Sequence, residues 1–324
     1  MAKILITDNL TGITTEIENP DIETIPILPQ KLTDIVSVTE FGAKGNGIAD
    51  DTIAFNNALA TTASVVTVPK GIYKVTATIL VTNKLLQLSH ESVITSSLDI
   101  DVIELGSKGK LLGGTVQTTN ANFTKSCIKL NGKNKISAST YFENVRVENA
   151  STSKYNGNGL LLQCRESLDN AYSYIMGVNA SNVYISGFDK GIFLDVPASD
   201  ELPEYTAISF INGNNFINLW FERCKYFMVL NGVNNGSRCV DGNHFVNTHL
   251  QYDDNVIAGV VCFGDRNIFN NIQFWDMGND WGHPLRSNIA IDFKETSSNN
   301  IVITPPMYEK YFNITDASNL LNFK

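Results

Sequence analysis

The sequence is poor in charge and has no long apolar run. Asp, Glu, Lys and Arg together make up 18% of the 324 residues, and the net charge is −9. Because the Lys and Arg residues form no basic stripe, the composition argues against nucleic acid as a partner. No apolar stretch approaches the ~20 residues of a membrane-spanning helix, so we expect no membrane insertion.

Paired cysteines are also missing. The chain has five cysteines, an odd number, and none forms a Cys-x-x-Cys pair. Several, such as Cys127 and Cys262, lie inside apolar runs. We therefore expect buried free thiols and neither a disulfide framework nor a zinc site.

The first residues, Met1–Ile6, lack the profile of a secretory signal peptide. We therefore expect synthesis in the cytosol, with any export by another route. Residues 1–36 contain three of the nine prolines and many Thr and Ile residues. This composition is typical of an extended arm or attachment segment rather than a packed domain.

What the sequence does have is a repeat. Five short segments each begin with Asn and then alternate a mostly apolar residue with a larger polar or aromatic one. These segments are Asn144–Glu148, Asn182–Ser186, Asn218–Glu222, Asn247–Gln251 and Asn271–Trp275. Irregular spacing between copies indicates stacked coils with loops of varying length. We expect the aligned asparagines to form a hydrogen-bonded ladder that satisfies polar groups inside the coils.

A second set of residues precedes the repeat. Glycines in residues 41–47 permit tight turns, and Asp50 or Asp51 can cap a helix over residues 52–62. We expect Ile53, Leu59 and the alanines to form its buried face. Residues 64–75 then indicate a strand, a turn and a second strand.

Residues 41–52 and 66–73 resemble the N-terminal signature of the pectate-lyase-like superfamily. The family pattern is Phe-Gly-Ala-x-Gly-Asp-Gly-x-x-Asp-Asp-Thr, a helix, and Val-x-Val-Pro-x-Gly-x-Tyr, and this chain departs from it with Asn46 in place of Asp. The resemblance implies an all-β fold, a right-handed single-stranded parallel β-helix whose open N-terminal end is closed by one helix. We expect an arm over 1–36, the β-helix over 37–304, and a C-terminal cap over 305–324 that begins at two prolines.

Strand alternation predicts which side chains face solvent. Counted from each Asn, positions +1 and +3 are nearly all apolar and should face inward. Position +2 should then form one outward column, consisting of Arg146, Tyr184, Trp220, His249 and Gln273. Position +4 should form a second, consisting of Glu148, Ser186, Glu222, Gln251 and Trp275. Exposed aromatics on such a surface indicate either stacking on sugars or burial in a subunit interface, and the sequence leaves both open.

Two carboxylates in the second column suggest catalysis. Glu148 and Glu222 lie two coils apart, so their backbones should be about 9.6 Å apart. Side-chain tilt could bring the carboxyls within the roughly 6.5–9.5 Å used by inverting glycosidases, one acting as acid and the other as base. We expect Arg146 and His249 to hold an acidic group of the substrate. Together with Tyr184, Trp220, Gln251, Gln273 and Trp275, they form the predicted substrate-binding set.

A metal site is the weaker alternative for a separate acidic group. Asp253, Asp254 and Asp276 follow the repeat strands, and their carboxylates could hold Ca²⁺ or Mg²⁺. Asp is also a favoured turn residue, and we prefer that interpretation here, so we expect no cofactor. The loop over residues 275–284, which also carries Asp280, is expected to wall one end of a groove.

The resemblance implies a carbohydrate-active or carbohydrate-binding protein, and the chain looks more like phage tail-spike and appendage proteins than like secreted pectinases. The leading hypothesis is a homotrimeric virion tail protein, extracellular when acting, that binds a bacterial capsule, lipopolysaccharide or teichoic acid and depolymerises it by hydrolysis. Its residues 1–36 would contact other tail proteins. A non-catalytic adhesive β-helix is one alternative. A polysaccharide lyase is another, with Arg146, Arg223 and His249 as the basic candidates.

Overall fold

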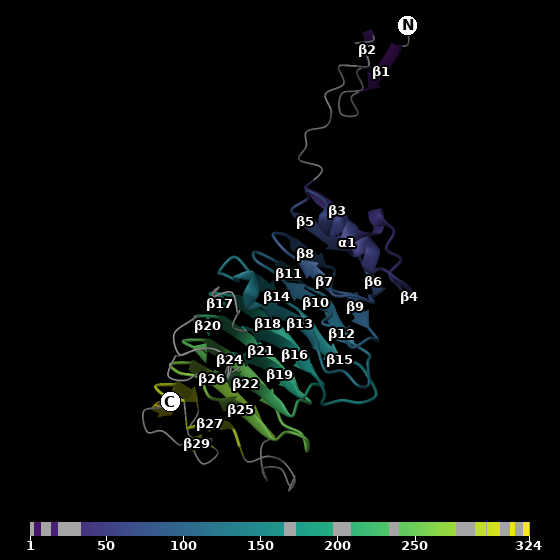
Figure 1. Cartoon of the computed structure of the whole chain (residues 1–324). Helices are drawn as coiled ribbons and strands as arrows, with labels where there is room; N and C mark the ends of the chain where they lie inside the picture. The colour runs from purple at the N-terminus through teal and green to yellow at the C-terminus, as the bar shows by residue number, and fades with distance from the viewer. Residues whose placement is uncertain are drawn as a thin grey trace.

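The computed structural model describes residues 3–7, 14–18, 34–164, 173–196, 209–232, 240–276, 289–295, 297–304, 312–314 and 320–323. Within these ranges the chain winds into coils whose equivalent strands stack side by side (Figure 1). All pairings between the coils are parallel, which confirms the predicted all-β parallel β-helix. At the N-terminus, β1 (Lys3–Thr7) and β2 (Thr14–Glu18) form a separate antiparallel pair.

One wall of the coils is a nine-stranded sheet. Its strands are β7 (Ile79–Val81), β10 (Ile103–Leu105), β13 (Ser126–Asn131), β16 (Asn158–Gln163), β19 (Lys190–Asp195), β22 (Tyr226–Asn231), β25 (Ala258–Cys262), β27 (Ile291–Phe293) and β29 (Phe312–Ile314). In chain order, β16, β19, β22, β25 and β27 each follow one copy of the repeat. A three-stranded sheet of β17 (Tyr174–Met176), β20 (Phe210–Asn212) and β23 (Val240–Asp241) adds a further side to the middle coils.

The sixteen-stranded sheet contains the repeat. Early coils supply two short strands each: β3 (Ile35–Ser37), β5 (Val65–Val68), β8 (Leu85–Leu88), β11 (Lys110–Leu112) and β14 (Tyr141–Glu143) on one side, and β4 (Asn46–Asp50), β6 (Gly71–Lys74), β9 (Ser92–Ser96), β12 (Thr115–Thr118) and β15 (Arg146–Asn149) on the other. Later coils supply β18 (Asn179–Ser186), β21 (Asn215–Glu222), β24 (His244–Gln251), β26 (Ile268–Trp275), β28 (Ile301–Thr304) and β30 (Leu320–Phe323). Both β14 and β15 pair with β18, so the two sides are halves of one bent strand.

The asparagines of the repeat occupy that bend. All five have φ between 54° and 56°, a left-handed conformation that Asn tolerates better than most residues. The side-chain amides of the last four each donate to the Asn of the preceding coil at 2.9–3.2 Å, so the predicted ladder is confirmed. Its expected location was wrong, because these side chains are exposed. The left-handed residue interrupts the strand alternation and turns the Asn outward together with the residue before it.

A second asparagine ladder lies inside the coils and was not predicted. Asn214, Asn243, Asn267 and Asn300 are fully buried. Their amides link from coil to coil at 2.8, 3.0 and 3.2 Å, and each Oδ1 also accepts the backbone N–H of the preceding ladder member. The signal was present in the sequence, because three of these residues stand four positions before an Asn of the repeat. This ladder satisfies the buried polar groups that the outer one does not reach.

The rest of the interior is apolar. Phe216, Phe245 and Phe269 stack in one column, with ring centroids 4.7 and 5.2 Å apart. Four of the five cysteines lie in the described part of the chain, and these four are buried, as the apolar runs around them predicted. Cys239 lies outside the described residues. Burial raises the pKa of the Cys224 thiol to about 12, so it behaves as an inert core group.

The single α-helix of the described residues is α1 (Thr52–Ala60), which lies at the N-terminal end of the stack (Figure 1). Its buried face was predicted correctly for Ala54, Ala58 and Leu59 and incorrectly for Ile53 and Ala60. Ile53 is 72% exposed, whereas Phe55 and Ala58 are buried. The Phe55 ring packs edge-on against Tyr73, with centroids 5.6 Å apart, and this contact sets the rotation of the helix. The short η3 (Val38–Phe41) precedes it, and a second 3-10 turn, η4 (Gly132–Asn134), follows β13.

The signature residues form one interlocked turn. The buried Asp51 carboxylate accepts hydrogen bonds from the backbone N–H groups of Lys44 and Gly45 at 2.6 and 3.1 Å. Gly45 has φ +58°, and a Cβ there would lie 2.8 Å from the ring of Tyr73. The Tyr73 hydroxyl donates to the Pro69 carbonyl at 2.9 Å, which fixes the ring in place.

We therefore expect Gly45→Ala to destabilise the protein by about 2–4 kcal/mol, from left-handed strain and overpacking together. Denaturant unfolding of the purified variant measures this cost. The matched control is Gly213→Ala, where φ is +60° but nothing lies within 4 Å of the added Cβ. Equal losses for the two variants would show that the Tyr73 contact contributes nothing.

The predicted boundaries of the N-terminal arm and the C-terminal cap lie close to residues that the structure does not describe. β3 already pairs with β5, so residues 35–37 are part of the sixteen-stranded sheet. Apart from β1 and β2, residues 1–33 lie outside the described part of the chain. In the expected C-terminal cap, β29 and β30 extend the two large sheets, and the remaining residues of 305–324 are not described.

Candidate functional site

The two predicted outward columns are continuous in the structure. The +2 residues pair in register from Arg146 through Tyr184, Trp220 and His249 to Gln273. The +4 residues follow the same register from Glu148 to Trp275. All residues at +1 and +3 are buried. The ten side chains, called the outer columns below, therefore share one face of the sixteen-stranded sheet.

The aromatic members stack along the coil axis. The Arg146 guanidinium lies 3.9 Å from the centroid of the Tyr184 ring. His249 is sandwiched between Trp220, at 3.7 Å and 10°, and Trp275, at 5.0 Å and 18°. Both indoles remain 41–49% exposed. Because the imidazole has both faces covered, a sugar could stack only on the outer faces and edges of the two tryptophans.

His249 is held as a neutral ring. Burial lowers the pKa of His249, so the imidazole is uncharged at neutral pH. Its Nε2 is buried and has no hydrogen-bond partner among the described residues. The Arg146 guanidinium forms an ion pair with Glu148 at 2.6 Å. His249 and Arg146 were expected to hold an acidic group of the substrate. In the structure His249 is a stacked neutral ring, and Arg146 is already paired with Glu148.

Glu222 is the best-positioned carboxylate of the columns. Its Oε2 accepts the Tyr184 hydroxyl at 2.7 Å, and its Oε1 accepts the Trp220 indole N–H at 3.1 Å. The Arg223 Nη2 lies 3.8 Å from Oε2. Burial raises the pKa of Tyr184, and the hydrogen bond to Glu222 raises it further. The phenol therefore keeps its proton at neutral pH and can donate it to Glu222. Three side chains thus hold one carboxylate beside an exposed indole.

The space between Glu148 and Glu222 is not empty. Ser186 separates them in the column and is 3% exposed, and its hydroxyl accepts a hydrogen bond from the Arg223 Nε at 3.1 Å. Arg223 has a left-handed backbone with φ 51°, which turns its side chain back over the sheet. A guanidinium therefore lies between the strands that carry the two carboxylates. The sequence placed Arg223 only among candidate lyase bases and did not indicate this position.

A loop missed by sequence reasoning borders the same region. Residues 150–157 follow β15, and the Lys154 Nζ donates to the Asn149 carbonyl. Burial lowers the pKa of Lys154, and the positive charge of Arg223 lowers it further. The Tyr155 hydroxyl donates to Asp253 Oδ2 at 2.7 Å across 98 residues of sequence, and burial raises the pKa of Tyr155 to about 12. No motif marks these residues, because their proximity arises only when the coils stack.

The acidic residues considered for a metal have other partners. Asp253 accepts from Tyr155 and from the backbone N–H of Asn255 at 2.9 Å, which is ordinary turn geometry. Asp276 accepts the Gln251 amide at 2.6 Å. Within the described ranges, His, Cys, Asp and Glu residues form no group of three that could hold a metal ion. Asp280 and the loop after Asp276 fall outside the described residues.

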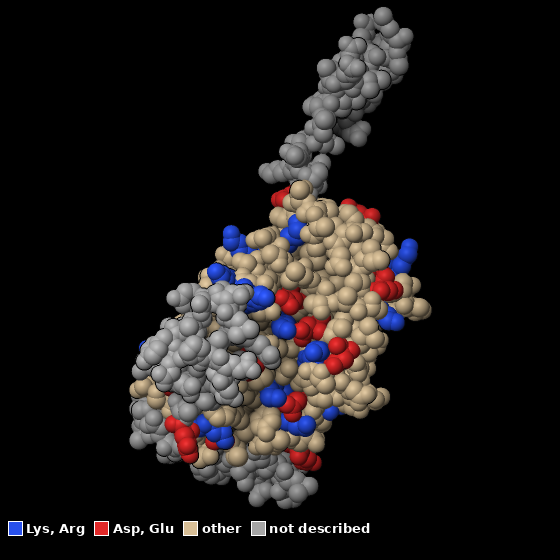
Figure 2. Space-filling view, viewed as in Figure 1, with Lys and Arg blue, Asp and Glu red and all other residues tan. Residues whose placement is uncertain are grey.

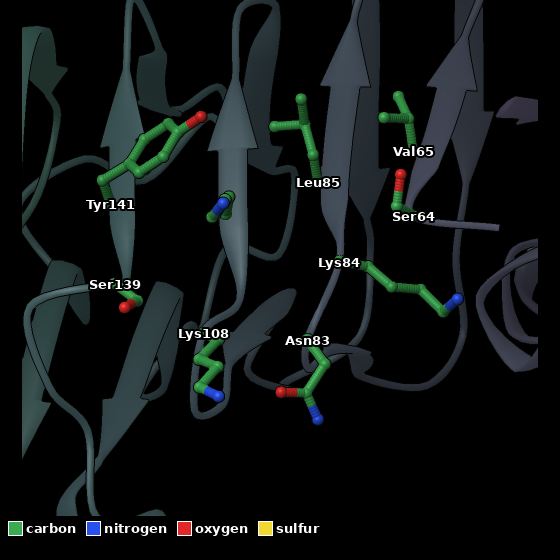
Figure 3. Close-up of a pocket in the computed structure, with 9 residues that line it drawn as sticks. Ser64, Val65, Asn83, Lys84, Leu85, Lys108, Ser139 and Tyr141 are labelled. Atoms are coloured by element: carbon green, nitrogen blue, oxygen red, sulfur yellow. The ribbon is translucent and has the colours of Figure 1, made fainter. Parts of the chain in front are cut away.

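Hollows occur elsewhere on the molecule. One of about 400 Å³ lies over β5, β8, β11 and β14 (Figure 3), and one of about 460 Å³ lies on the outer face of the nine-stranded sheet. Neither is lined by a residue of the outer columns. In the part of the chain that the structure describes, no helix is both long and apolar enough to cross a membrane.

One family model matches the N-terminal part of the stack. A family model described as rhamnogalacturonase A/epimerase, pectate lyase-like, matches residues 35–97. A search of curated proteins finds no match.

Solved structures with a similar course of the chain include three proteins. ORF18 of Geobacillus virus E2 has 16% identity and a TM-score of 0.44, and the match covers 99% of this chain and 66% of the ORF18 chain. PfbA, a surface adhesin of Streptococcus pneumoniae, has 11% identity and a TM-score of 0.37, covering 83% and 85%. The tailspike gp49 of Acinetobacter baumannii bacteriophage Fri1, a capsular polysaccharide depolymerase, has 12% identity and a TM-score of 0.36, covering 89% and 62%. This chain spans less than two thirds of that tailspike's length, and TM-scores this low assign no activity.

Proposed function

We propose that this chain, a right-handed parallel β-helix of the pectate-lyase-like type, binds a bacterial surface polysaccharide along its outer columns and hydrolyses it. The observation that carries the proposal is the Glu222 carboxylate, held by Tyr184 and Trp220 on an open, aromatic-bearing face. The columns repeat in register over five successive coils and carry two half-exposed tryptophans, and a surface of this length suits a polymer. We assign Glu222 and Glu148 as the acid–base pair of the hydrolysis.

The proposed setting is a virion tail, where the chain would act outside the cell as a receptor-binding depolymerase. We propose a homotrimer, and residues 1–36 would attach it to other tail proteins. Light scattering of the purified protein should give three times the chain mass.

The activity is tested by incubating the full chain with capsule, lipopolysaccharide and teichoic-acid preparations. Hydrolysis of one of them should release new reducing ends without the ultraviolet absorbance of an unsaturated uronate. Binding without any release would favour the non-catalytic adhesive alternative. Neither binding nor release from any preparation would contradict the proposal.

A lyase is the second candidate, and the surroundings of Lys154 favour it. Lys154 has a lowered pKa and lies near the positive charge of Arg223, an arrangement that suits a base abstracting a proton beside a uronate carboxylate. If cleavage produces the absorbance of an unsaturated uronate, and Lys154→Met abolishes it, the reaction is an elimination and not a hydrolysis. The two reactions are therefore separated by one product measurement.

Stacking on Trp220 makes a separate prediction about affinity. We expect Trp220→Ala to weaken polysaccharide binding about tenfold, because the exposed face of the indole is lost. Calorimetric titration with the bound polysaccharide measures the change. Ile217→Ala is the matched control, since Ile217 is an exposed apolar residue on the same strand β21 and lies outside the outer columns. Unchanged affinity in Trp220→Ala would leave this aromatic without a role in glycan binding.

A further inference from the structure

The hollow shown in Figure 3 is a second surface with ligand-binding character, separate from the outer columns. It has a volume of about 400 Å³ and lies where β5, β8, β11 and β14 run side by side. Its lining residues are Ser64, Val65, Asn83, Lys84, Leu85, Lys108, Lys110, Ser139 and Tyr141. Apolar side chains and the Tyr141 ring alternate with hydroxyl, amide and ammonium groups. Ligand sites of this size commonly combine such an apolar base with a few polar groups.

The charge of this hollow has one sign. Three lysines line it, and no Asp or Glu does, although the whole chain carries a net charge of −9. Figure 2 shows basic side chains grouped near the β8 and β11 edge of the stack, whereas basic and acidic side chains alternate further along it. A local positive field on an acidic protein selects anionic groups.

The three lysines do not have the same role. The Lys84 Nζ donates to the Thr61 carbonyl at 2.6 Å and to the Ala63 carbonyl, so its ammonium is used within the fold. Lys110 lies over the Tyr141 ring, with its Nζ 5.5 Å from the centroid, and Lys108 is exposed at a left-handed turn. Across the described ranges, no carboxylate lies within ion-pair distance of Lys108 or Lys110. Two ammonium groups are therefore available to one ligand.

The hollow borders the coil at which the outer columns begin. Tyr141 on β14 and Arg146 on β15 belong to the same coil, on either side of the bend at Asn144. Four successive strands border the hollow, a span of about 14 Å at the ordinary strand spacing, and the outer columns continue from this coil toward the C-terminus. An extended polymer lying along the stack could thus contact both surfaces at once.

We propose that this hollow binds an anionic substituent of the polysaccharide, through Lys108 and Lys110, with the sugar ring against Tyr141. The proposal rests on the proposed function and narrows its substrate to an acidic glycan. Within the outer columns, Arg146 is paired with Glu148 and His249 is neutral, so the cationic recognition would come from the hollow instead. Carboxylate and sulfate or phosphate share this chemistry, and the test separates them.

The test uses short probes on the full chain, so that it does not depend on cleavage. Calorimetric titrations compare oligogalacturonate, a sulfated dextran oligosaccharide and neutral dextran. We expect an anionic probe to bind and neutral dextran not to bind. In the double variant Lys108→Gln and Lys110→Gln, affinity for the anionic probe should fall about tenfold or more, because charge-assisted contacts are lost. Preference for oligogalacturonate identifies a uronate, and preference for the sulfated probe identifies a sulfate- or phosphate-type group.

A matched charge control is available. Lys133→Gln removes one exposed ammonium outside the hollow and should leave the affinity unchanged. Equal weakening in Lys133→Gln and the double variant, or binding of neutral dextran as tight as that of the anionic probes, would overturn the inference. Lysine-dependent binding of a short anionic probe by a chain that cleaves no polymer would keep the inference and remove the proposed hydrolysis. If the chain cleaves a neutral polysaccharide and binds neither anionic probe, the proposed hydrolysis stands and the inference about the hollow is wrong.

Discussion

Glu222→Gln is expected to bind the surface polysaccharide as tightly as the native chain and to cleave it about 10²–10⁴-fold more slowly. The amide keeps the size of the side chain: its oxygen can accept the Trp220 indole N–H, and its NH2 group can donate to the Tyr184 hydroxyl oxygen once that hydroxyl turns. It cannot, however, gain or lose the proton that the reaction requires. Reducing-end release under saturating polysaccharide measures the rate, and calorimetric titration measures the affinity.

Two further variants identify what such a loss means. Glu143→Gln changes an outward carboxylate on β14, outside the outer columns, and should leave the rate unchanged. Tyr184→Phe removes the 2.7 Å hydrogen bond to Glu222 and should cause a smaller loss, since the carboxylate stays but is held less firmly. Native-rate cleavage by Glu222→Gln would show that another group carries the chemistry, and Lys154 would then be examined first.

The largest expected effect on stability comes from the inner asparagine ladder. We expect Asn243→Ala to lower the free energy of unfolding by roughly 3 kcal/mol or more. The buried Asn243 side chain accepts from the backbone and the amide of Asn214, and it donates to Asn267 and to the Ile211 carbonyl. Removing it leaves several of these groups without partners in a site that water does not reach. Denaturant unfolding monitored by circular dichroism measures the loss.

The outer ladder provides the matched comparison. Asn247→Gly removes the same amide chemistry at an exposed position, and glycine tolerates its φ of 54°. Water can replace the lost hydrogen bonds there, so we expect a cost of about 1 kcal/mol or less. If the two variants lost equal stability, burial would not be what gives the inner ladder its importance.

Sequence reasoning succeeded where a rule is local. Alternation within a strand predicted that Val145 and Val147 face inward while Arg146 and Glu148 face outward, and this follows from backbone geometry alone. It failed at Ile53, because the rotation of a short helix depends on which partner its residues meet. It also placed the outer asparagines inside, because a left-handed residue breaks the alternation on which the prediction relied.

The candidate site divides in the same way. The membership of the outer columns was readable from the repeat, since parallel stacking brings equivalent positions into line. The partners within the site were not. That Arg146 pairs with Glu148, that Tyr184 holds Glu222 and that Tyr155 reaches Asp253 depends on rotamers and on loops that pack across several coils.

By itself the sequence determined that this chain forms stacked coils and which side chains face outward, because periodicity and strand alternation act between near neighbours. Only the tertiary structure decided which charges are already paired and which remain available. It neutralised His249 between two indoles, engaged Lys84 with backbone carbonyls, and left Lys108 and Lys110 facing the same hollow. The physical reason is that burial and ion pairing depend on distances between coils, which no short stretch of sequence encodes.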